Sequence, residues 1–373
     1  MAFELARRGI DVLILERAKL PRYKLCGGGV TWKSVRQLAF DISPIVQKTL
    51  RRLTLMRNGS PRVTIQFDKP LVYMTMRDEF DAFLTARACE QGAKLVDGQS
   101  VTQIVETDDG YQIETPSAGY RCQVIVGADG VHSKVAQSVG LRNKPVLGLG
   151  LEAEIPMTAE QMVVWQDSLC VDFGRVRRGY GWIFPKQDHL SVGVAAEETS
   201  YRDLKNYYDE FVATELKIES APPRPLGHFL PMRQRNMPIQ HGRALLVGDA
   251  AGLVDPFTGE GIYYAIRSAQ IAAVEIVKLM QREQTDLYNY ERRIDAEFMP
   301  DFANSLLVSH LFSLAPDLAL TMLAHNKTWQ VCLCQIIRGE ITSSEAARIL
   351  GPFQFLFVAA SRRLMPQHRF QTN

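Results

Sequence analysis

The chain has 373 residues, of which 46% are hydrophobic and 23% charged, so it is long enough for two or three units and is neither disordered nor fibrous. Its 43 basic and 41 acidic residues leave a net charge of +2, which argues against a nucleic-acid-binding surface. The six cysteines lack the spacing of a disulfide framework, which favours a reducing compartment. Cys332 and Cys334 have no partner pair at metal-ligand spacing, so no metal site is predicted. With no export signal, and with apolar stretches 306–323 and 349–360 interrupted or too short to span a bilayer, we expect a cytoplasmic protein that can contact a membrane surface.

The first predicted elements are typical of a nucleotide-binding unit. Residues 1–9 resemble the end of a helix that stops at Gly9, and residues 10–15 predict a short buried strand of the parallel type. The strand ends in Glu16, where a dinucleotide-binding fold has an acidic residue for the adenosine ribose. In that fold a glycine-rich loop lies about 20 residues earlier, but 15 residues precede Glu16. We therefore expect the loop and the first strand to be encoded upstream of Met1, as in a fragment or a chain with a misassigned start.

The rest of the chain predicts strands, then a sheet insertion, then helices. Residues 53–76 alternate in strand fashion, and residues 77–92 have the apolar spacing of an amphipathic helix. Strand-like runs within 146–197 predict an inserted antiparallel sheet. The remaining predicted elements are strands at 99–106, 111–115, 122–127 and 244–248, a long helix at 261–280, and helices after about 285.

Three separated motifs each follow a predicted strand: Glu16, the turn Gly127–Gly130, and the segment Gly248–Gly252 with its continuation to Ile262. In this order they resemble the motifs of the para-hydroxybenzoate hydroxylase-like superfamily of FAD-dependent enzymes. Within the last motif, Asp249 can accept hydrogen bonds from the ribityl chain of the flavin. The helix that starts at its end can face the flavin with free amide groups, which favour the anionic reduced form.

Two further motifs narrow the resemblance. The segment Pro21–Gly29 reads P-x-x-K-x-C-G-G-G, and Tyr180–Lys186 reads Y-x-W-x-F-P-K. Both are similar to motifs of the geranylgeranyl reductase family, and the resemblance extends from Met1 to about residue 290. On a strand, Tyr180, Trp182 and Phe184 project to one face, where they would form an apolar wall for a polyprenyl chain.

The resemblance implies an α/β fold and a set of site residues. The expected parts are a Rossmann-type FAD-binding domain from residues 1–52, 77–143 and 241–284, an antiparallel β substrate domain from 53–76 and 144–240, and a helical region at 285–373. The implied cofactor-binding residues are Glu16, Arg17, Lys24, Cys26, Gly27, Arg77, Val101, Ala128, Asp129, Gly130, Gly248, Asp249, Pro256, Gly259, Gly261 and Ile262. The implied substrate-binding residues are Tyr180, Trp182, Phe184, Pro185 and Lys186.

The implied chemistry is hydride delivery from flavin N5 to one alkene carbon and proton delivery to the other, with FAD as cofactor and NAD(P)H or ferredoxin as electron donor. Cys26 is a candidate catalytic proton source, although a buried thiol without a chemical role fits at least as well. Lys186 and the arginines of 175–178 are candidate ligands for a substrate pyrophosphate, with a solvated basic edge as the favoured interpretation. His132 and His228 have no nucleophilic partner in the sequence, so a hydrolase is not predicted.

Two rival hypotheses stay open. In an aromatic hydroxylase or halogenase of the same superfamily, reduced flavin would react first with oxygen. Tyr180 and Phe184 replace a tryptophan and an isoleucine of the halogenase pattern W-x-W-x-I-P, which leaves hydroxylation as the alternative. The second rival is an inactive truncated product, because loss of a first strand opens two sheet edges and removes the amides that hold a pyrophosphate. The expected partners are an isoprenoid lipid and an electron donor.

Overall fold

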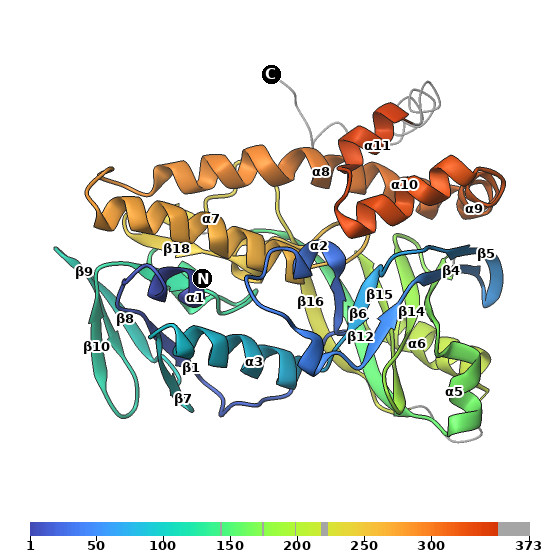
Figure 1. The fold of residues 1–373 in the computed structure, drawn as a ribbon, viewed down its shortest axis with the longest axis horizontal. Helices are drawn as coiled ribbons and strands as arrows, with labels where there is room; N and C mark the ends of the chain where they lie inside the picture. The colour runs from blue at the N-terminus through green and yellow to red at the C-terminus, as the bar shows by residue number, and fades with distance from the viewer. Residues whose placement is uncertain (142–143, 174, 198, 218–222, 350–373) are drawn as a thin grey trace.

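The structure of the protein is a computed structural model that describes residues 1–373 except 142–143, 174, 198, 218–222 and 350–373. The molecule is elongated, with small sheets near the N-terminus at one end, a large sheet at the other, and two long helices that run along its length (Figure 1). Most of the apolar stretch 349–360 and the end of the predicted helical region 285–373 lie outside the described residues.

A two-stranded parallel sheet lies close to the N-terminus. β1 (Leu13–Glu16) pairs in parallel with β7 (Lys94–Asp97), beside the packed helices α1 (Ala2–Ala6) and α3 (Arg77–Glu90). The predicted parallel strand is present, but the expectation that it is buried is wrong, since Leu13 is 38% exposed. The physical reason is that β7 pairs with one edge of β1 and no described strand pairs with the other edge.

A second parallel pair carries the glycine-rich turns. β11 pairs in parallel with β18, and the buried β18 leads into a turn of 3-10 helix and then a long helix. The core of this unit packs the strand residue Leu245 against Ile271, Tyr290 and Phe298 of the two long helices. The elements of the unit are β11 (Ile125–Gly127), α4 (Lys134–Ser138), β17 (Gln240–His241), β18 (Ala244–Leu246), η2 (Gly248–Ala251) and α7 (Ile262–Met280).

An antiparallel meander connects the two parallel pairs. Its strands are β8 (Gln103–Thr107), β9 (Gly110–Glu114) and β10 (Gly119–Cys122). The predicted strand at 122–127 is two strands, since β10 ends at Cys122 and β11 begins at Ile125.

The largest sheet has seven strands in the order β16-β12-β15-β14-β13-β4-β5. The strands are β4 (Arg52–Arg57), β5 (Ser60–Gln66), β12 (Val146–Pro156), β13 (Ser168–Phe173), β14 (Gly179–Pro185), β15 (His189–Glu197) and β16 (Leu226–Met232). Neighbouring strands are antiparallel except β13 and β4, which pair in parallel. The predicted antiparallel sheet is therefore confirmed, with one parallel pair inside it.

The strand prediction for residues 53–76 needs one correction. After β5 the chain leaves the large sheet at Asp68-Lys69-Pro70, a polar turn that ends in a residue without a backbone donor. The following strand β6 (Val72–Met74) pairs with β2 (Gly29–Thr31) and β3 (Lys48–Leu50) in a separate small sheet. This small sheet positions the glycine-rich loop that precedes β2. Two short helices flank it, α2 (Trp32–Val35) and the 3-10 helix η1 (Ser43–Ile45).

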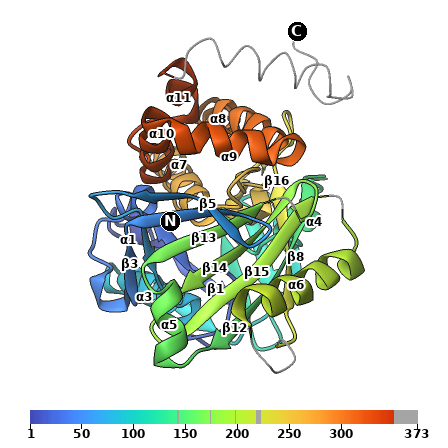
Figure 2. The same ribbon diagram turned by 90° about the vertical axis from the view of Figure 1, so that its right-hand side faces the viewer.

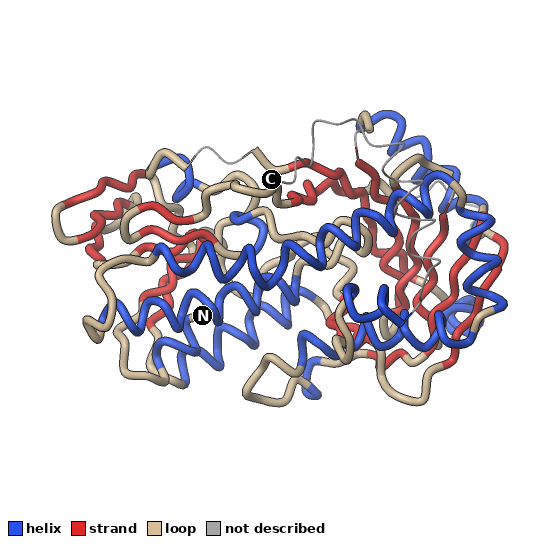
Figure 3. Tube along the Cα trace, turned by 90° about the horizontal axis from the view of Figure 1, so that it is seen from above, coloured by secondary structure: helices blue, strands red, loops and turns tan. Residues whose placement is uncertain are grey.

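Helices cover both faces of the large sheet (Figure 2). On one face, α6 buries Leu204, Tyr208 and Phe211, and α5 contributes Met162 to the same core. On the other face lie the C-terminal helices, and α7 and α8 run along the molecule (Figure 3), which confirms the predicted helical region over its described part. The helices are α5 (Ala159–Trp165), α6 (Tyr201–Leu216), α8 (Tyr288–Leu314), α9 (Pro316–His325), α10 (Lys327–Arg338) and α11 (Ser343–Ile349). Taken one at a time, none of the described helices has the length and apolar character to cross a bilayer, although the pair α8 and α9, bent by 108°, has both.

Candidate active site

A cavity of about 640 Å³ lies between the large sheet, the start of α7 and helices α8 to α10. This volume is typical of a small-molecule site. Across the large sheet, the side chains that line the cavity include polar ones on β16 and β12 and are apolar on β13 and β4. We call one part the polar end, lined by Lys24–Gly29, Arg77, Glu152, His228, Asp249 and Gly259–Ile262. The apolar end is lined by Leu53, Leu55, Leu169, Val171, Leu323, Trp329, Leu333, Ile336 and Ile337.

The glycine loop at the polar end is held by a buried lysine. Lys186 is 1% exposed, and its Nζ donates hydrogen bonds to the carbonyl oxygens of Gly27 and Thr75, both at 2.7 Å. Gly28 has a φ of +64°, and a Cβ there would collide with the Thr75 carbonyl oxygen. Burial lowers the pKa of Lys186 to about 8. The interpretation of Lys186 as part of a solvated edge is therefore wrong, and neither Lys186 nor Pro185 lines the cavity.

The aromatic ladder on β14 forms the middle of the cavity wall. Tyr180, Trp182 and Phe184 all line the cavity, with neighbouring ring centroids 6.0 and 6.2 Å apart. The prediction that they project to one face is confirmed. Tyr180 Oη donates to the Thr258 carbonyl oxygen at 2.7 Å, and Trp182 lies over Gly193, where a Cβ would collide with the indole. Hydrogen bonding and packing thus fix the ladder in one position.

Asp249 supplies an anionic group at the polar end. It follows β18 within η2, and His228 Nε2 lies 3.4 Å from its Oδ2. Burial opposes ionisation, but the hydrogen bond from His228 and the charges of Lys24 and Arg77 outweigh burial and hold the pKa of Asp249 below its usual value. His228, which the sequence left without a role, therefore orients Asp249.

The start of α7 faces the same end of the cavity. Gly259–Ile262 line it, and no side chain caps the helix N-terminus. First-turn amides have no intrahelical partner and carry the positive end of the helix dipole. Glu260 also lines the cavity, but its charge is compensated, because it accepts a hydrogen bond from Thr31 Oγ1 at 2.6 Å and pairs with Lys33 Nζ at 2.5 Å. The helix start can therefore receive an electron-rich group.

Arg77 connects the cavity with β1 through a series of ion pairs. It is the first residue of α3, and its side chain is 12% exposed. Arg77 pairs with Asp81 at 2.9 Å, Asp81 with Arg22 at 2.9 Å, and Arg22 with Glu16 at 3.4 Å. Arg77 is thus an oriented, mostly buried cation rather than a solvated residue at a helix end.

Half of the predicted cofactor-binding residues lie outside the cavity. They are Glu16, Arg17, Val101, Ala128, Asp129, Gly130, Gly248 and Pro256. Asp129 Oδ2 accepts the backbone amide of Lys134 at 2.7 Å at the start of α4, and Lys134 Nζ donates to the Val101 carbonyl oxygen at 2.5 Å. Most of the eight follow β1, β11 or β18, at the carboxyl ends of parallel strands, where open α/β sheets bind nucleotides.

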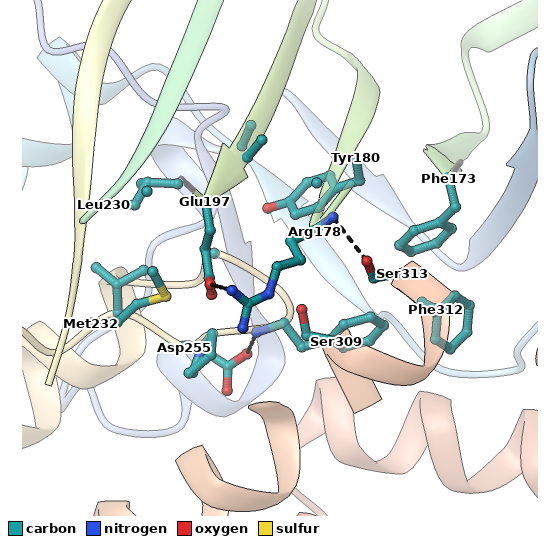
Figure 4. Close-up of a pocket in the computed structure, with 18 residues that line it drawn as sticks. Phe173, Arg178, Tyr180, Glu197, Leu230, Met232, Asp255, Ser309, Phe312 and Ser313 are labelled. Atoms are coloured by element: carbon teal, nitrogen blue, oxygen red, sulfur yellow. Dashed lines mark hydrogen bonds and ion pairs between the residues drawn. The ribbon is translucent and has the colours of Figure 1, made fainter. Parts of the chain in front are cut away.

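A small pocket of about 40 Å³ lies beside the cavity, between the large sheet and α8 (Figure 4). Arg178 points into it, with Nη1 3.4 Å from Glu197 Oε2 and Nη2 2.7 Å from His310 Nε2. Pro256 lines this pocket and not the large cavity.

The arginines of 175–178 do not form a preformed pyrophosphate site. Arg175 pairs with Glu210 at 2.8 Å and with Glu215 at 3.0 Å, while Arg178 pairs with Glu197. Because acidic partners already compensate the charges of Arg175 and Arg178, the structure argues against this candidate role for these two arginines.

Two parts of the site were missed by sequence reasoning. Glu152 on β12 is 4% exposed and lines the cavity, and burial raises its pKa to about 7. A signal was present, because glutamates at 152 and 154 interrupt an otherwise apolar strand. The second part is the wall formed by α9 and α10, whose apolar side chains were assigned to a helical region without a function. Their helical apolar period was the available signal.

The cysteines show no sign of metal binding in the described part of the chain, where no group of three or more His, Cys, Asp or Glu side chains could hold an ion. Cys332 and Cys334 are buried in α10, and burial raises the pKa of both thiols. Cys26 differs, because it lines the polar end of the cavity and its Sγ accepts the Gly28 amide at 3.5 Å.

Comparisons with known proteins agree with this architecture. The family model described as FAD binding domain matches residues 1–303. The chain is 32% identical over 298 residues to an uncharacterized protein of Methanosarcina barkeri, covering 80% of this chain and 76% of that protein. It is 28% identical to the chloroplastic geranylgeranyl diphosphate reductase of Nicotiana tabacum, with 80% of this chain and 68% of the relative covered. It is 27% identical to the digeranylgeranylglycerophospholipid reductase of Methanocaldococcus jannaschii, with 77% of each chain covered.

Solved structures share the fold at lower identity. A geranylgeranyl bacteriochlorophyll reductase-like protein from Thermoplasma acidophilum superposes with a TM-score of 0.79 at 21% identity, covering 98% of this chain and 95% of the other. The flavin-dependent brominase Bmp2 superposes with a TM-score of 0.77 at 17% identity, covering 97% and 95%. At these identities the likeness concerns the fold alone. From the family match and the sequence relatives, the chain belongs to the FAD-binding-domain family and, within it, to the oxidoreductases of the geranylgeranyl reductase type.

Proposed function

We propose that this chain is a FAD-dependent reductase that saturates carbon–carbon double bonds of a geranylgeranyl or related isoprenoid chain. The observation that carries the proposal is the continuity of the cavity, in which the polar and apolar ends belong to one space behind the aromatic ladder. A flavin at the polar end and a prenyl chain at the apolar end would meet at Trp182. The names of the tobacco and Methanocaldococcus relatives support this class of substrate.

The polar end fits the flavin end of FAD. A Cβ at Gly27 would lie 2.9 Å from the Phe184 ring, and one at Gly28 would collide with Thr75, so the loop presents bare backbone to the cavity. We assign Asp249 to the ribityl hydroxyl groups and the first turn of α7 to the electron-rich edge of the flavin ring. Lys24 and Arg77 add positive charge beside them. When bound in its reduced form, FAD supplies a hydride.

The remaining predicted residues are assigned to parts of FAD beyond the cavity. We propose Glu16, Arg17 and Val101 for the adenosine portion, in keeping with the carboxyl ends of strands as nucleotide sites. The turn Ala128–Gly130 and Gly248 follow the second parallel pair and are proposed for the neighbouring part of the cofactor. Pro256 is proposed to shape the loop that leads into α7.

The protein itself must position the alkene and keep water away from it, because an unactivated double bond accepts hydride poorly. Tyr180, Trp182 and Phe184 present ring faces to the cavity, and the apolar end continues this dry wall on α9 and α10. Burial of a prenyl chain contributes about 25 cal/mol per Å² of apolar surface. The binding energy of the tail can therefore hold one double bond against the ladder.

The electron donor and the location of the protein are also proposals. NAD(P)H or ferredoxin is proposed to reduce the flavin, as the resemblance to the geranylgeranyl reductase family implies. A cytoplasmic protein that associates with the membrane surface would meet a prenyl lipid where such lipids reside.

An anaerobic reoxidation experiment tests the function. The protein is purified, its flavin absorbance is recorded, and after anaerobic reduction a geranylgeranyl lipid is added. We expect the oxidised flavin spectrum to return without oxygen and the lipid to gain two hydrogens per event by mass spectrometry. A requirement for oxygen, with a hydroxylated product, would favour the hydroxylase alternative. Failure to hold flavin would favour an inactive product.

A further inference from the structure

The structure contains a buried acid at the cavity wall that has no assigned role. Glu152 lies in the middle of β12, between the neighbouring strands β15 and β16, and its side chain is directed to the cavity. It is 4% exposed, in a strand whose other core residues include Leu151, Ala153 and Ile155. A buried carboxyl group in such surroundings is costly unless it is hydrogen-bonded, paired or neutral, and such groups are found preferentially at functional sites.

Hydrogen bonds fix one oxygen of this carboxyl group. Ser191 Oγ donates to Glu152 Oε1 at 2.6 Å, and Trp182 Nε1 donates to Ser191 Oγ at 3.3 Å. Gly193 makes the arrangement possible, because a Cβ there would displace the indole from its place over β15. Within the described residues, no hydrogen bond involves Glu152 Oε2. The carboxyl group is thus oriented through one oxygen and keeps the other for the cavity.

Charged and titratable groups approach Glu152 from several elements. Lys186 after β14 and Arg77 on α3 favour its ionised form, and Glu154 on β12 opposes it. Tyr208 of α6 and Tyr23 of the loop after β1 also sense its charge. Burial is the largest influence and raises the pKa of Glu152 to about 7, so a substantial fraction of the carboxyl group is protonated at neutral pH.

We propose that Glu152 is the general acid of the reduction, and that it delivers a proton to the alkene carbon that does not receive hydride. This inference rests on the proposed function. The O–H bond of Glu152 breaks and a C–H bond forms at one carbon, while a hydride from reduced flavin forms the C–H bond at the other. The two electrons come from the reduced flavin, which is thereby oxidised, and the Glu152 carboxylate is reprotonated from solvent. The aromatic ladder holds the double bond next to the Ser191–Glu152 pair.

Cys26 is the competing proton source, and the structure places it less favourably. Its Sγ accepts the Gly28 amide at 3.5 Å, which orients the sulfur as an acceptor. Glu152, in contrast, keeps one oxygen free of protein hydrogen bonds among the described residues. The two candidates are separable by substitution.

The first measurement compares Glu152→Gln, Cys26→Ala and the control Glu154→Gln. Glutamine keeps the size of Glu152 and an acceptor for Ser191, so the fold and flavin content should be retained. We expect the rate of anaerobic flavin reoxidation by lipid to fall about 100-fold or more in Glu152→Gln. In the wild type this rate should decline as pH rises through about 7, the pKa of Glu152, and this decline should be absent in Glu152→Gln. Glu154→Gln should keep the rate and a decline, but because the charge of Glu154 raises the pKa of Glu152, the decline should move to somewhat lower pH.

The second measurement does not depend on turnover. Infrared difference spectra of wild type against Glu152→Gln should contain the C=O stretch of a protonated carboxylic acid at pH 6, which disappears as pH rises through about 7. Absence of this band would overturn the inference, as would a wild-type-like rate and pH profile in Glu152→Gln or a large loss of rate confined to Cys26→Ala. If lipid does not reoxidise the reduced flavin of the wild type, the proposed function itself fails. This result is distinguishable from failure of the Glu152 inference, because it is obtained with the wild type alone.

Discussion

The polar and apolar ends of the cavity are built in different ways. At the polar end, hydrogen bonds from His228 and Ser191 orient Asp249 and Glu152. Gly28 lies so close to neighbouring backbone that no side chain fits there. At the apolar end, Leu55, Leu323 and their neighbours are held by packing between β4, β13, α9 and α10. The polar end therefore depends on the positions of individual atoms, whereas the apolar end depends on volume. A rigid cofactor suits the first and a flexible hydrocarbon chain the second.

The strongest way to break the polar end is Gly28→Ala. The new Cβ would meet the Thr75 carbonyl oxygen from a left-handed backbone, so we expect a loss of about 3 kcal/mol or more in the free energy of unfolding, and loss of bound flavin. Gly140→Ala is the control, because Gly140 also has a positive φ, +72°, but its Cβ would meet nothing within 4 Å. Urea unfolding and flavin absorbance measure both effects. Equal losses in the two variants would contradict the collision.

A milder change at the polar end is Asp249→Asn. Hydrogen bonds to charged groups contribute about 1.5–3 kcal/mol, so flavin affinity should fall about 10- to 100-fold. Flavin fluorescence titration measures the affinity. Asp108→Asn, in an exposed turn, is the control and should leave it unchanged. Unaltered affinity in Asp249→Asn would remove Asp249 from the cofactor site.

The apolar end should respond to volume. Ile336→Trp fills part of the cavity from α10, and we expect the KM for a geranylgeranyl lipid to rise about 10-fold, roughly 1.4 kcal/mol, with little change for a shorter geranyl substrate and none in flavin content. Val331→Trp on the same helix is the control, since Val331 is 43% exposed. Steady-state kinetics with both chain lengths check this. An equal rise for both lipids would mean that chain length is not read at α10.

The smallest expected effect concerns the hydrogen bond between Ser191 and Glu152 at the polar end. The hydrogen bond from Ser191 lowers the pKa of Glu152, so Ser191→Ala should raise it. The decline of the reoxidation rate should then move to higher pH, by about one unit or less, which corresponds to about 1.4 kcal/mol or less. Ser138→Ala, at an exposed position, should not move it. A shift to lower pH would contradict the assignment of the decline to Glu152.

The sequence predicted those parts of the molecule that depend on local pattern. The aromatic ladder follows from the period of a strand, and Asp249 and the start of α7 follow from a motif at a strand end. The antiparallel sheet was predicted, but the parallel pairing of β13 with β4 was not, because strand pairing between distant segments leaves no local trace.

Burial was the main source of error. Lys186 follows a strand at the start of a polar turn, yet the segments of Gly27 and Thr75 enclose it, and a local pattern does not contain that information. Leu13 has the apolar neighbours of a buried strand but lies partly exposed, because burial depends on which strands flank it. Glu152 was overlooked for the same reason, since the glutamates at 152 and 154 mark polar positions in an apolar strand but do not indicate that one of them lines a cavity.

The enclosed ammonium group of Lys186 has a thermodynamic consequence. Its pKa is lowered to about 8 from an unfolded value of 10.5, so between these values the unfolded chain binds more protons than the native protein. The contribution of this residue to stability is thus complete above about pH 10.5 and is lost as pH falls through about 8. At neutral pH the protein keeps a charged group where burial disfavours it, and unfolding in mildly alkaline buffer should be accompanied by proton uptake at this site. The glycine loop is therefore anchored by two hydrogen bonds from an ammonium group whose charged form burial disfavours.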